Sequence, residues 1–347
     1  MLIIDGSFGE GGGQILRTAL ALSAVTHTPI TVNNIRRGRA KPGLQIQHIT
    51  GARALAEICG GKLKGDELYS ANLTFEPGEI KAGSFEFDVA KMGPSAGSTS
   101  LIVQQLLPAL MYAKDTSYVV VKGGTDVPAA PPAEYLEHAF LPTLNKMGIE
   151  AASEVKKWGF YPAGGGEIKF SVKPLSGKIN PLELKSRGAL KNLECLALSS
   201  DLPGSVTERE DKQAKKLLDE AKLNVDIQTC KHDTLSSGPG NVFLVFANYE
   251  NATAGFAAYG EFGKPAEKVA GEAVTDFLKF HSGVAAVDKH LADQLLLYYA
   301  LADGPGSLLA EEITPHIQTN AWVIEQFLPV KFEISGNSID LKKLAGK

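Results

Sequence analysis

The sequence predicts a fold of mixed helices and strands, in which a duplicated helix-on-sheet unit is interrupted by a smaller inserted α/β domain. Three observations support this prediction: strands and helices alternate along the chain, two stretches share one pattern, and residues 185–280 differ from the rest in composition and charge. With 347 residues, the chain is long enough for two domains with a sizeable core.

The regular elements follow from the spacing of apolar residues. Alternating runs predict strands at 117–124, 167–173 and 329–335, and the apolar start of the chain predicts a short strand before a glycine loop. Apolar residues at helical spacing predict helices at 44–58, 97–111, 132–147 and 289–302.

A weak internal repeat links two parts of the chain. Residues 44–90 and 134–174 each run from a helix through a glycine-containing break into strands. Phe75-x-Pro77 and Phe160-x-Pro162 occupy similar places in the two stretches, 85 residues apart. We therefore predict a duplicated unit of helices on a β-sheet. A chance likeness between two α/β stretches is the alternative.

The inserted segment has its own set of elements. It contains a strand-like run at 193–200, a charged helix at 207–223, strand-like runs at 225–230, 241–249 and 255–262, and a helix at 265–280. That set could fold alone, and glycine-rich character returns after it. We predict a large domain of residues 1–184 plus 281–347, with residues 185–280 inserted as a small α/β domain.

The bulk composition excludes several classes of protein. A net charge of −4 argues against a surface coated with basic residues, so any site for a polyanion must be a local patch. Cys59, Cys195 and Cys230 form no CxxC, so neither a disulfide framework nor a metal cluster is expected. With no signal-peptide pattern and no run of about 18 apolar residues, we expect a cytoplasmic protein with no membrane segment.

The stretch "DGSFGEGGGQILRTALAL" places a glycine loop between a strand and a helix, which favours a phosphate cradle. It is not a P-loop, and Gln14 stands where G-x-G-x-x-G needs its last glycine. Glu10 would repel phosphates unless a divalent cation lay between them, so Glu10 is a candidate Mg²⁺ ligand. The alternative is a tight turn with an exposed glutamate. Glycine-rich stretches at 92–105 and 123–136 also lead into helices, so we expect a cleft lined by helix starts and loops.

A basic cluster follows the second predicted strand. Arg36, Arg37, Arg39 and Lys41 lie within six residues, with no acidic residue between them. Planar guanidinium groups suit phosphate oxygens, so the cluster is a candidate anion site. A solvated basic loop is the alternative.

His316 has the most distinctive surroundings among the seven histidines. Pro315 precedes it, polar residues follow, and an apolar run closes the segment, as a rigidly held side chain needs. Neutral imidazole is a nucleophile near pH 7, and its adduct with phosphorus is easily transferred. The alternative is the polar tip of a turn. Asp293 and Gln294 interrupt an apolar helix some twenty residues earlier, and no K-x-D-G, HExxH or GxSxG motif offers another chemistry.

Taken together, these stretches resemble the RNA 3′-terminal phosphate cyclases. The resemblance covers nearly the whole chain. It is strongest in "DGSFGEGGGQILRTALALS", "IRRGRAKPGLQIQH", "GGTDVPAAPPAEYL", "GFYPAGGGE", "HLADQLLLYYALA" and "PHIQTNAWVIEQFLPVKFEI". Because many long stretches occur in the right order, the resemblance is more specific than any single motif.

The resemblance implies an α+β fold: a large domain of three repeated helix-on-four-stranded-sheet units, with a smaller inserted α/β domain. It also implies ATP, Mg²⁺ or Mn²⁺, and RNA with a 3′-phosphate end as cofactors and partners. In that chemistry a histidine attacks the α-phosphorus of ATP to form enzyme–AMP. AMP then moves to the RNA 3′-phosphate, and the neighbouring 2′-hydroxyl displaces it to leave a 2′,3′-cyclic phosphate.

Carried onto this sequence, the resemblance makes His316 the nucleophile and Glu10 the metal ligand. It assigns Arg17, Arg36, Arg39 and Gln47 to the phosphates, Gln104 and Pro131 to the adenine, and Asp293 and Gln294 to the surroundings of the nucleophile. One position departs from the family. His290 stands where an aromatic residue is expected to stack on adenine, and imidazole stacks less strongly.

Two other functions are compatible with parts of this pattern. A non-catalytic, cyclase-like ribosome-assembly protein would share the fold but lack the histidine. An enolpyruvyl transferase would bind phosphorylated substrates with arginines, but it would have no use for His316 and would act on phosphoenolpyruvate rather than ATP.

Overall fold

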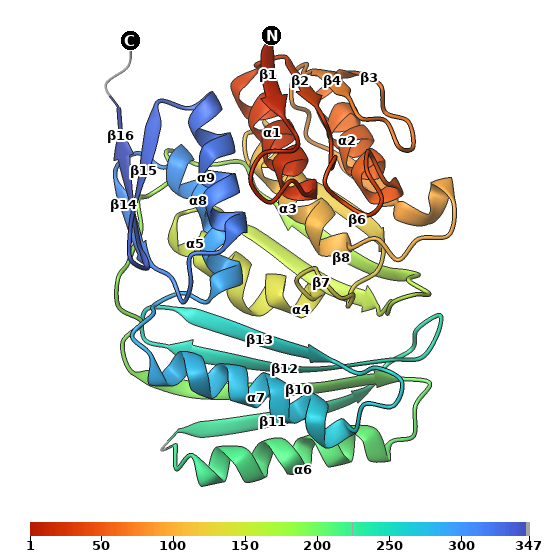
Figure 1. The fold of residues 1–347 in the computed structure, drawn as a ribbon, viewed down its shortest axis with the longest axis vertical. Helices are drawn as coiled ribbons and strands as arrows, with labels where there is room; N and C mark the ends of the chain where they lie inside the picture. Colours follow the sequence, from red (N-terminus) through yellow and green to blue (C-terminus); the bar gives the residue numbers. More distant parts are fainter. Residues whose placement is uncertain (224, 345–347) are drawn as a thin grey trace.

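The computed structural model describes residues 1–223 and 225–344, and within them three four-stranded sheets share one strand order (Figure 1). The first has the order β1–β2–β4–β3, with β1 (Leu2–Asp5), β2 (Ile30–Asn33), β3 (Lys62–Lys64) and β4 (Leu73–Glu76). The second has the order β5–β6–β8–β7, with β5 (Ser84–Asp88), β6 (Ser117–Gly123), β7 (Ala151–Lys157) and β8 (Gly166–Val172). The third has the order β9–β14–β16–β15, with β9 (Glu183–Leu184), β14 (Gly306–Leu309), β15 (Val330–Ser335) and β16 (Ser338–Lys343).

The strand directions are also the same in the three sheets. The first two strands are parallel, and the remaining pairs are antiparallel. Parallel neighbours need a crossover, which helices provide. The crossovers contain α1 (Gly13–Thr26), α3 (Thr99–Leu110) preceded by the 3₁₀ turn η1 (Val89–Met92), and α8 (Lys289–Leu301). The α+β class and the repeated helix-on-sheet units are therefore confirmed.

A second helical segment follows the second strand of each unit. These segments are α2 (Ile46–Cys59), the consecutive turns α4 (Ala133–Tyr135), η2 (Leu136–Phe140, a π-helix) and α5 (Leu141–Lys146), and α9 (Pro315–Phe327). No helix in residues 1–223 or 225–344 is both long and apolar enough to span a bilayer.

The predicted repeat exists, but its alignment of Phe75 with Phe160 is wrong. Phe75 lies in β4, whose counterpart in the second unit is β8. Phe160 instead lies in the connection between β7 and β8, where it bridges to Asp126. The stretch 44–90 also ends in β5, which belongs to the second sheet. The short motif misled because Phe-x-Pro suits both the end of a strand and the turn that precedes one.

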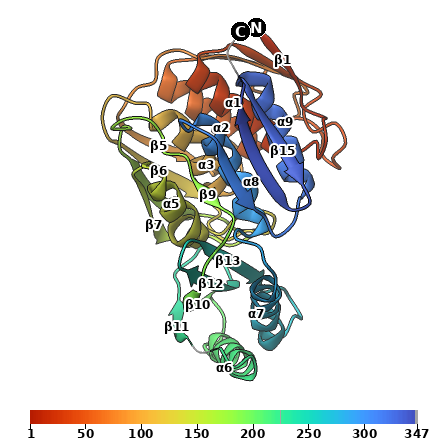
Figure 2. The same cartoon turned by 90° about the vertical axis from the view of Figure 1, so that its left-hand side faces the viewer.

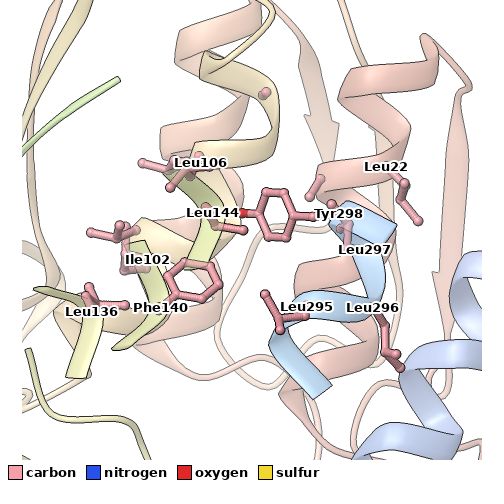
Figure 3. Close-up of a cluster of buried hydrophobic side chains, with 14 of the residues drawn as sticks. Leu22, Ile102, Leu106, Leu136, Phe140, Leu144, Leu295, Leu296, Leu297 and Tyr298 are labelled. Carbon is pink, nitrogen blue, oxygen red and sulfur yellow. The ribbon is translucent and has the colours of Figure 1, made fainter. Parts of the chain in front are cut away.

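Helices of all three units meet in one apolar core (Figure 3). Leu22 comes from α1, Ile102 and Leu106 from α3, Phe140 from η2, and Tyr298 from α8. The rings of Phe140 and Tyr298 meet edge to face, with centroids 5.8 Å apart. This core holds helices that are far apart in the sequence in one fixed arrangement.

The chain between β9 and α8 forms a fourth sheet, which lies at one end of the molecule (Figures 1 and 2). Its order is β11–β10–β12–β13, with β10 (Leu190–Ser200), β11 (Asp226–Asp233), β12 (Gly240–Tyr249) and β13 (Thr253–Tyr259). Two helices, α6 (Ser205–Glu220) and α7 (Ala266–Ser282), pack on one face of this sheet and enclose a second apolar core.

Both faces of the central strand β12 are buried. Along β12, Phe243 and Val245 belong to the core beneath α6 and α7, whereas Val242, Leu244 and Phe246 belong to the main core. This explains the continuous apolar run at 241–249, because a strand covered on both sides needs no polar face. The sequence suggested that residues 185–280 could fold alone. That expectation did not take into account that one face of β12 is covered by the main core.

We still propose that this segment is an inserted domain, because the unit topology resumes after it. The structure supports a boundary slightly later than residue 280. Helix α7 runs to Ser282, and Ala285 still packs in the second core.

Candidate active site

Helix α9 begins at Pro315, so His316 lies in the first turn of a helix rather than at the tip of a turn. Thr314 is the N-cap, and its side chain accepts a hydrogen bond from the Ile317 N–H at 3.2 Å. Proline is well suited to the first helical position, where its missing N–H costs nothing. The Thr-Pro pair was the available signal for this helix start, and it fixes the backbone that carries His316.

The His316 ring is held from one side by Gln14, in the first turn of α1. Nδ1 of His316 lies 2.6 Å from Oε1 of Gln14. Because an amide oxygen only accepts hydrogen bonds, Nδ1 carries the proton and Nε2 keeps its lone pair. The Gln14 side chain also lies close enough to Asp293 on α8 to lower the pKa of that carboxyl. The arrangement leaves the lone pair of Nε2 free.

The surroundings of His316 favour its neutral form. Burial lowers its pKa below the usual value, and the positive charges of Arg17 and Arg39 lower it further. The side chain is nevertheless 48% exposed, so a ligand can reach it. At neutral pH the ring is therefore an uncharged and accessible nucleophile.

The glycine loop passes directly over α9 and places Glu10 beside His316. The Glu10 N–H donates to Oγ1 of Thr319 at 3.0 Å, and Oε2 of Glu10 lies 3.8 Å from Nδ1 of His316. The carboxylate also forms an ion pair with Arg39. Gly9 has a φ of 54°, and a Cβ there would lie 2.4 Å from Oγ1 of Thr319, so only glycine permits this close approach.

Asn320 joins the three helices that surround the candidate site. Its Oδ1 accepts from Oγ1 of Thr18 at 2.7 Å, and its Nδ2 donates to the backbone oxygen of Asp293 at 2.7 Å. Asn320 is on α9, Thr18 on α1 and Asp293 on α8. These bonds fix the helix starts that bear Gln14, Asp293 and His316 relative to one another.

A cavity of about 380 Å³ opens next to His316. Seven of the predicted site residues line it: Arg17, Gln104, Pro131, His290, Asp293, Gln294 and His316. Nε2 of Gln104 donates to Oε1 of Gln294 at 2.9 Å, so α3 and α8 meet in its wall. Gly255, Ala257 and Tyr259 of β13 complete the lining, and the inserted segment is thus one wall of the cavity.

Two partly buried ionisable side chains, Arg17 and Asp293, face this cavity. Burial lowers the pKa of Arg17 to about 10, partly offset by Asp293, so the guanidinium stays charged at neutral pH. Burial raises the pKa of Asp293 to about 7, although Arg17 opposes this shift. A partly buried cation that remains charged is a suitable partner for a phosphate.

The other predicted residues lie outside the cavity lining. Glu10 and Arg39 are at its mouth, beside His316. Arg36 donates to the backbone oxygens of Lys41 and Gly43 and so braces its own loop. Oε1 of Gln47 accepts from the Ser98 N–H at 2.9 Å, at the start of α3. For Arg36 and Gln47, contact with phosphate stays a prediction.

Comparison with known proteins identifies the family. The family profile described as RNA 3′-terminal phosphate cyclase matches residues 8–334. The chain belongs to this family. The match includes the glycine loop with Glu10, the basic cluster and the segment with His316.

Relatives of the cyclase family match over almost their full length. An RNA 3′-terminal phosphate cyclase from Trichormus variabilis is 44% identical over 330 residues, covering 94% of this chain and 94% of the relative. One from Methylococcus capsulatus is 42% identical over 330 residues, covering 94% and 91%. One from Pyrococcus furiosus is 41% identical over 337 residues, covering 97% and 96%. The predicted family and its enzyme class are confirmed.

The cyclase fold implies a divalent cation, and the residues present fit one bound partly by substrate. In the described part of the chain, no three His, Cys, Asp or Glu side chains gather as a complete metal site. Oε2 of Glu10 is buried, however, and has no hydrogen-bond partner. Mg²⁺ is commonly held by one or two carboxylates together with substrate phosphates, so one unpartnered carboxylate oxygen suits it.

Sequence reasoning missed three residues that organise the site. Gln14 was noted only because it interrupts a glycine motif, and Asn320 only as a polar residue after His316. His48 is partly buried beside Gly13 and Arg17, and desolvation lowers its pKa to about 3, so it is a neutral structural residue. Its Nδ1 accepts from the Gln45 N–H at 3.0 Å. No local pattern marks such roles, because each depends on a partner from another unit.

Proposed function

We propose that the chain converts an RNA 3′-terminal phosphate into a 2′,3′-cyclic phosphate with ATP, through a covalent His316–AMP intermediate. The observation that carries this proposal is the free Nε2 of His316, with Nδ1 held on Gln14, at the mouth of a cavity lined by Arg17, Gln104 and Gln294. The names of the full-length relatives support the same activity.

In the first step, Nε2 of His316 attacks the α-phosphorus of ATP. A phosphorus–nitrogen bond forms, the bond to the bridging oxygen breaks, and pyrophosphate leaves. The imidazole becomes cationic as this bond forms. Its Nδ1–H then donates to the amide oxygen of Gln14, so the developing charge has a prearranged acceptor.

In the later steps, an oxygen of the RNA 3′-phosphate displaces His316 and takes the AMP. The adjacent 2′-hydroxyl then attacks the 3′-phosphorus, AMP leaves, and the hydroxyl proton passes to solvent. This last step needs no strong base, because AMP is a good leaving group and the nucleophile is already beside the phosphorus. Arg17, Arg39 and, in our proposal, Arg36 offset the negative charge of the phosphates.

A divalent cation held through Glu10 would supply further positive charge beside the phosphates. Glu10 is suited to this because the Thr319 hydroxyl fixes its backbone and its Oε2 has no hydrogen-bond partner. Replacement of Glu10 by Gln would keep the shape of the loop and weaken the binding of the cation.

Labelling with ATP that carries ³²P at the α-position tests the proposal directly. We expect a labelled protein that is labile to acid and stable to base, as a phosphorus–nitrogen bond requires. His316→Ala and His316→Asn should abolish the label. His232→Ala, which removes an exposed histidine from β11, is the matched control and should label like the wild type.

A second assay separates an enzyme from a non-catalytic relative. RNA ending in a 3′-phosphate, incubated with ATP and Mg²⁺ or Mn²⁺, should gain an end that resists phosphatase. If His316→Ala is labelled as strongly as the wild type, His316 is not the nucleophile. If the wild-type protein neither becomes labelled nor cyclises RNA, the non-catalytic alternative is favoured.

A further inference from the structure

We propose that Phe8, supported by Trp322, is a stacking platform for the last bases of the RNA strand whose 3′-phosphate reacts at His316. The inference rests on the proposed function, because it names the surface that holds the polynucleotide substrate. Neither residue lines the cavity beside His316, so this surface is separate from the space available to ATP.

The two aromatic rings form an exposed stacked pair. The ring centroids of Phe8 and Trp322 are 4.0 Å apart and the ring planes are 17° from parallel. Phe8 is nevertheless 40% exposed. Since Trp322 covers one ring face, the exposure of Phe8 comes from the other face and the ring edge. Trp322 itself packs against the main core, so the pair has a fixed base.

The pair lies next to the candidate chemistry. Phe8 precedes Glu10 by two residues, and Trp322 follows Thr319 by one helical turn on α9. Thr319 is the residue that accepts from the Glu10 N–H. The glycine loop therefore runs beside α9, with Gln14 next to His316 and Phe8 next to Trp322. Trp322 follows His316 by six residues, which is a rise of about 9 Å along the helix axis.

Charge near the pair suits a polynucleotide. Arg37 and Lys41 are exposed on the loop that also bears Arg39. Arg37 lies close enough to influence Asp5, whose carboxylate accepts from Ser7, the residue before Phe8. Neither Arg37 nor Lys41 has an ion-pair partner among residues 1–223 and 225–344. Cations beside an aromatic platform are the usual combination in sites for single-stranded nucleic acids.

This chemistry predicts binding without sequence preference. Every base has a π-face, so a platform of this kind accepts any terminal nucleotide. It selects unpaired ends, because a base within a duplex has no free face to offer. The ligand class is therefore single-stranded RNA with a 3′-phosphate, of any sequence.

The experiment compares Phe8→Ala, Phe8→Tyr and Phe8→Leu with the wild type. Fluorescence anisotropy of a labelled single-stranded RNA with a 3′-phosphate, without ATP, gives the dissociation constant. We expect Phe8→Ala to weaken binding roughly 5- to 150-fold, the range for one lost base–aromatic stack. Phe8→Tyr should bind like the wild type, whereas Phe8→Leu, which is apolar but has no π-face, should bind like Phe8→Ala. Phe262→Ala, at a fully exposed phenylalanine between β13 and α7, is the matched control.

Formation of enzyme–AMP from ATP alone separates the platform from a packing role. If the pair only anchors the loop that carries Glu10, Phe8→Ala should slow this step as much as it weakens RNA binding, and Phe8→Leu should restore both. Either result would overturn the proposal, as would RNA binding that Phe8→Ala leaves unchanged. The anisotropy assay needs no catalysis, so a wild type that forms no enzyme–AMP would refute the proposed function without deciding the platform.

Discussion

Gln14 connects the candidate nucleophile to the wall of the cavity. Its amide oxygen accepts from Nδ1–H of His316, and the same side chain lies close enough to Asp293 to lower the pKa of that carboxyl. An amide is suited to this position because it can accept on one side and donate on the other. The link selects the tautomer of His316 in which Nε2 is free to react.

Removal of this link should slow the first chemical step. We expect Gln14→Ala to reduce the rate of enzyme–AMP formation by roughly 10- to 100-fold, as when the second partner of a metal-ligating histidine is removed. The affinity for ATP, measured by calorimetry, should change much less, because Gln14 orients the nucleophile and is not needed to hold the nucleotide. An equal loss in both quantities would indicate a binding role instead.

Gln14→Glu gives the same prediction a second readout. In the wild type, burial and the nearby arginines hold the pKa of His316 below its usual value. The rate should therefore fall only when the pH drops below about 6.5. A carboxylate beside Nδ1–H favours the imidazolium and raises the pKa of His316, so the fall should begin at a higher pH. An acid limb at the same pH in both proteins would contradict the assigned contact.

At the scale of elements, the start of α9 decides where His316 lies. Thr314 accepts from the Ile317 N–H, and Pro315 fixes the first helical residue. The glycine loop and α9 are then locked by Thr319 and Asn320, which bond to Glu10 and Thr18. A helix start, rather than a flexible turn, therefore presents the imidazole.

Loss of the cap should weaken this helix start. We expect Thr314→Ala to lower the free energy of unfolding by about 1 kcal/mol, the usual cost of removing an N-cap side chain. Enzyme–AMP formation should also slow, because the first turn carries His316. Thr314→Ser keeps the hydroxyl acceptor and is the control. Urea denaturation measures the free energy of unfolding of each variant. If Thr314→Ser is as unstable as Thr314→Ala, the methyl group of Thr314 matters more than its hydroxyl cap.

At the scale of the whole molecule, Arg187 ties the inserted segment to the rest of the chain. Its guanidinium donates to the backbone oxygens of Phe280, His281, Gly283 and Ala285. The connection that enters the insertion is thus held to the end of α7 and to the connection that leaves it. The same group lies over the rings of Tyr249 and Phe280, at 5.0 and 4.9 Å from their centroids. One residue thus connects the two ends of the inserted segment.

Replacement of Arg187 should destabilise this junction. We expect Arg187→Met to lower the free energy of unfolding by about 2–4 kcal/mol, because several charge-assisted bonds to backbone oxygens are lost in a partly buried place. The Michaelis constant for ATP should rise, since β13 forms a wall of the cavity. Lys185→Met, which removes an exposed ion pair with Asp340, is the control and should cost less than about 1 kcal/mol. Equal effects in urea denaturation would refute a special role for Arg187.

The local features of this protein were determined by the sequence alone. Apolar spacing predicted α2, α3, α7 and α8 close to their observed bounds, and the surroundings of His316 and Glu10 marked both as site residues. The helix predictions succeeded because apolar periodicity acts over a few neighbouring residues. The roles of His316 and Glu10 stay predictions. The family resemblance supplied the third unit, which no internal pattern showed.

Only the tertiary structure decided which distant residues meet. Gln14 and His316 are separated by 302 positions, and the pairing of Phe8 with Trp322 spans a similar distance in the chain. Likewise, the run at 241–249 showed that β12 is apolar but not that its second face is covered by the main core. Hydrophobic patterning specifies that a residue is buried, whereas the partner that buries it depends on how the units pack together.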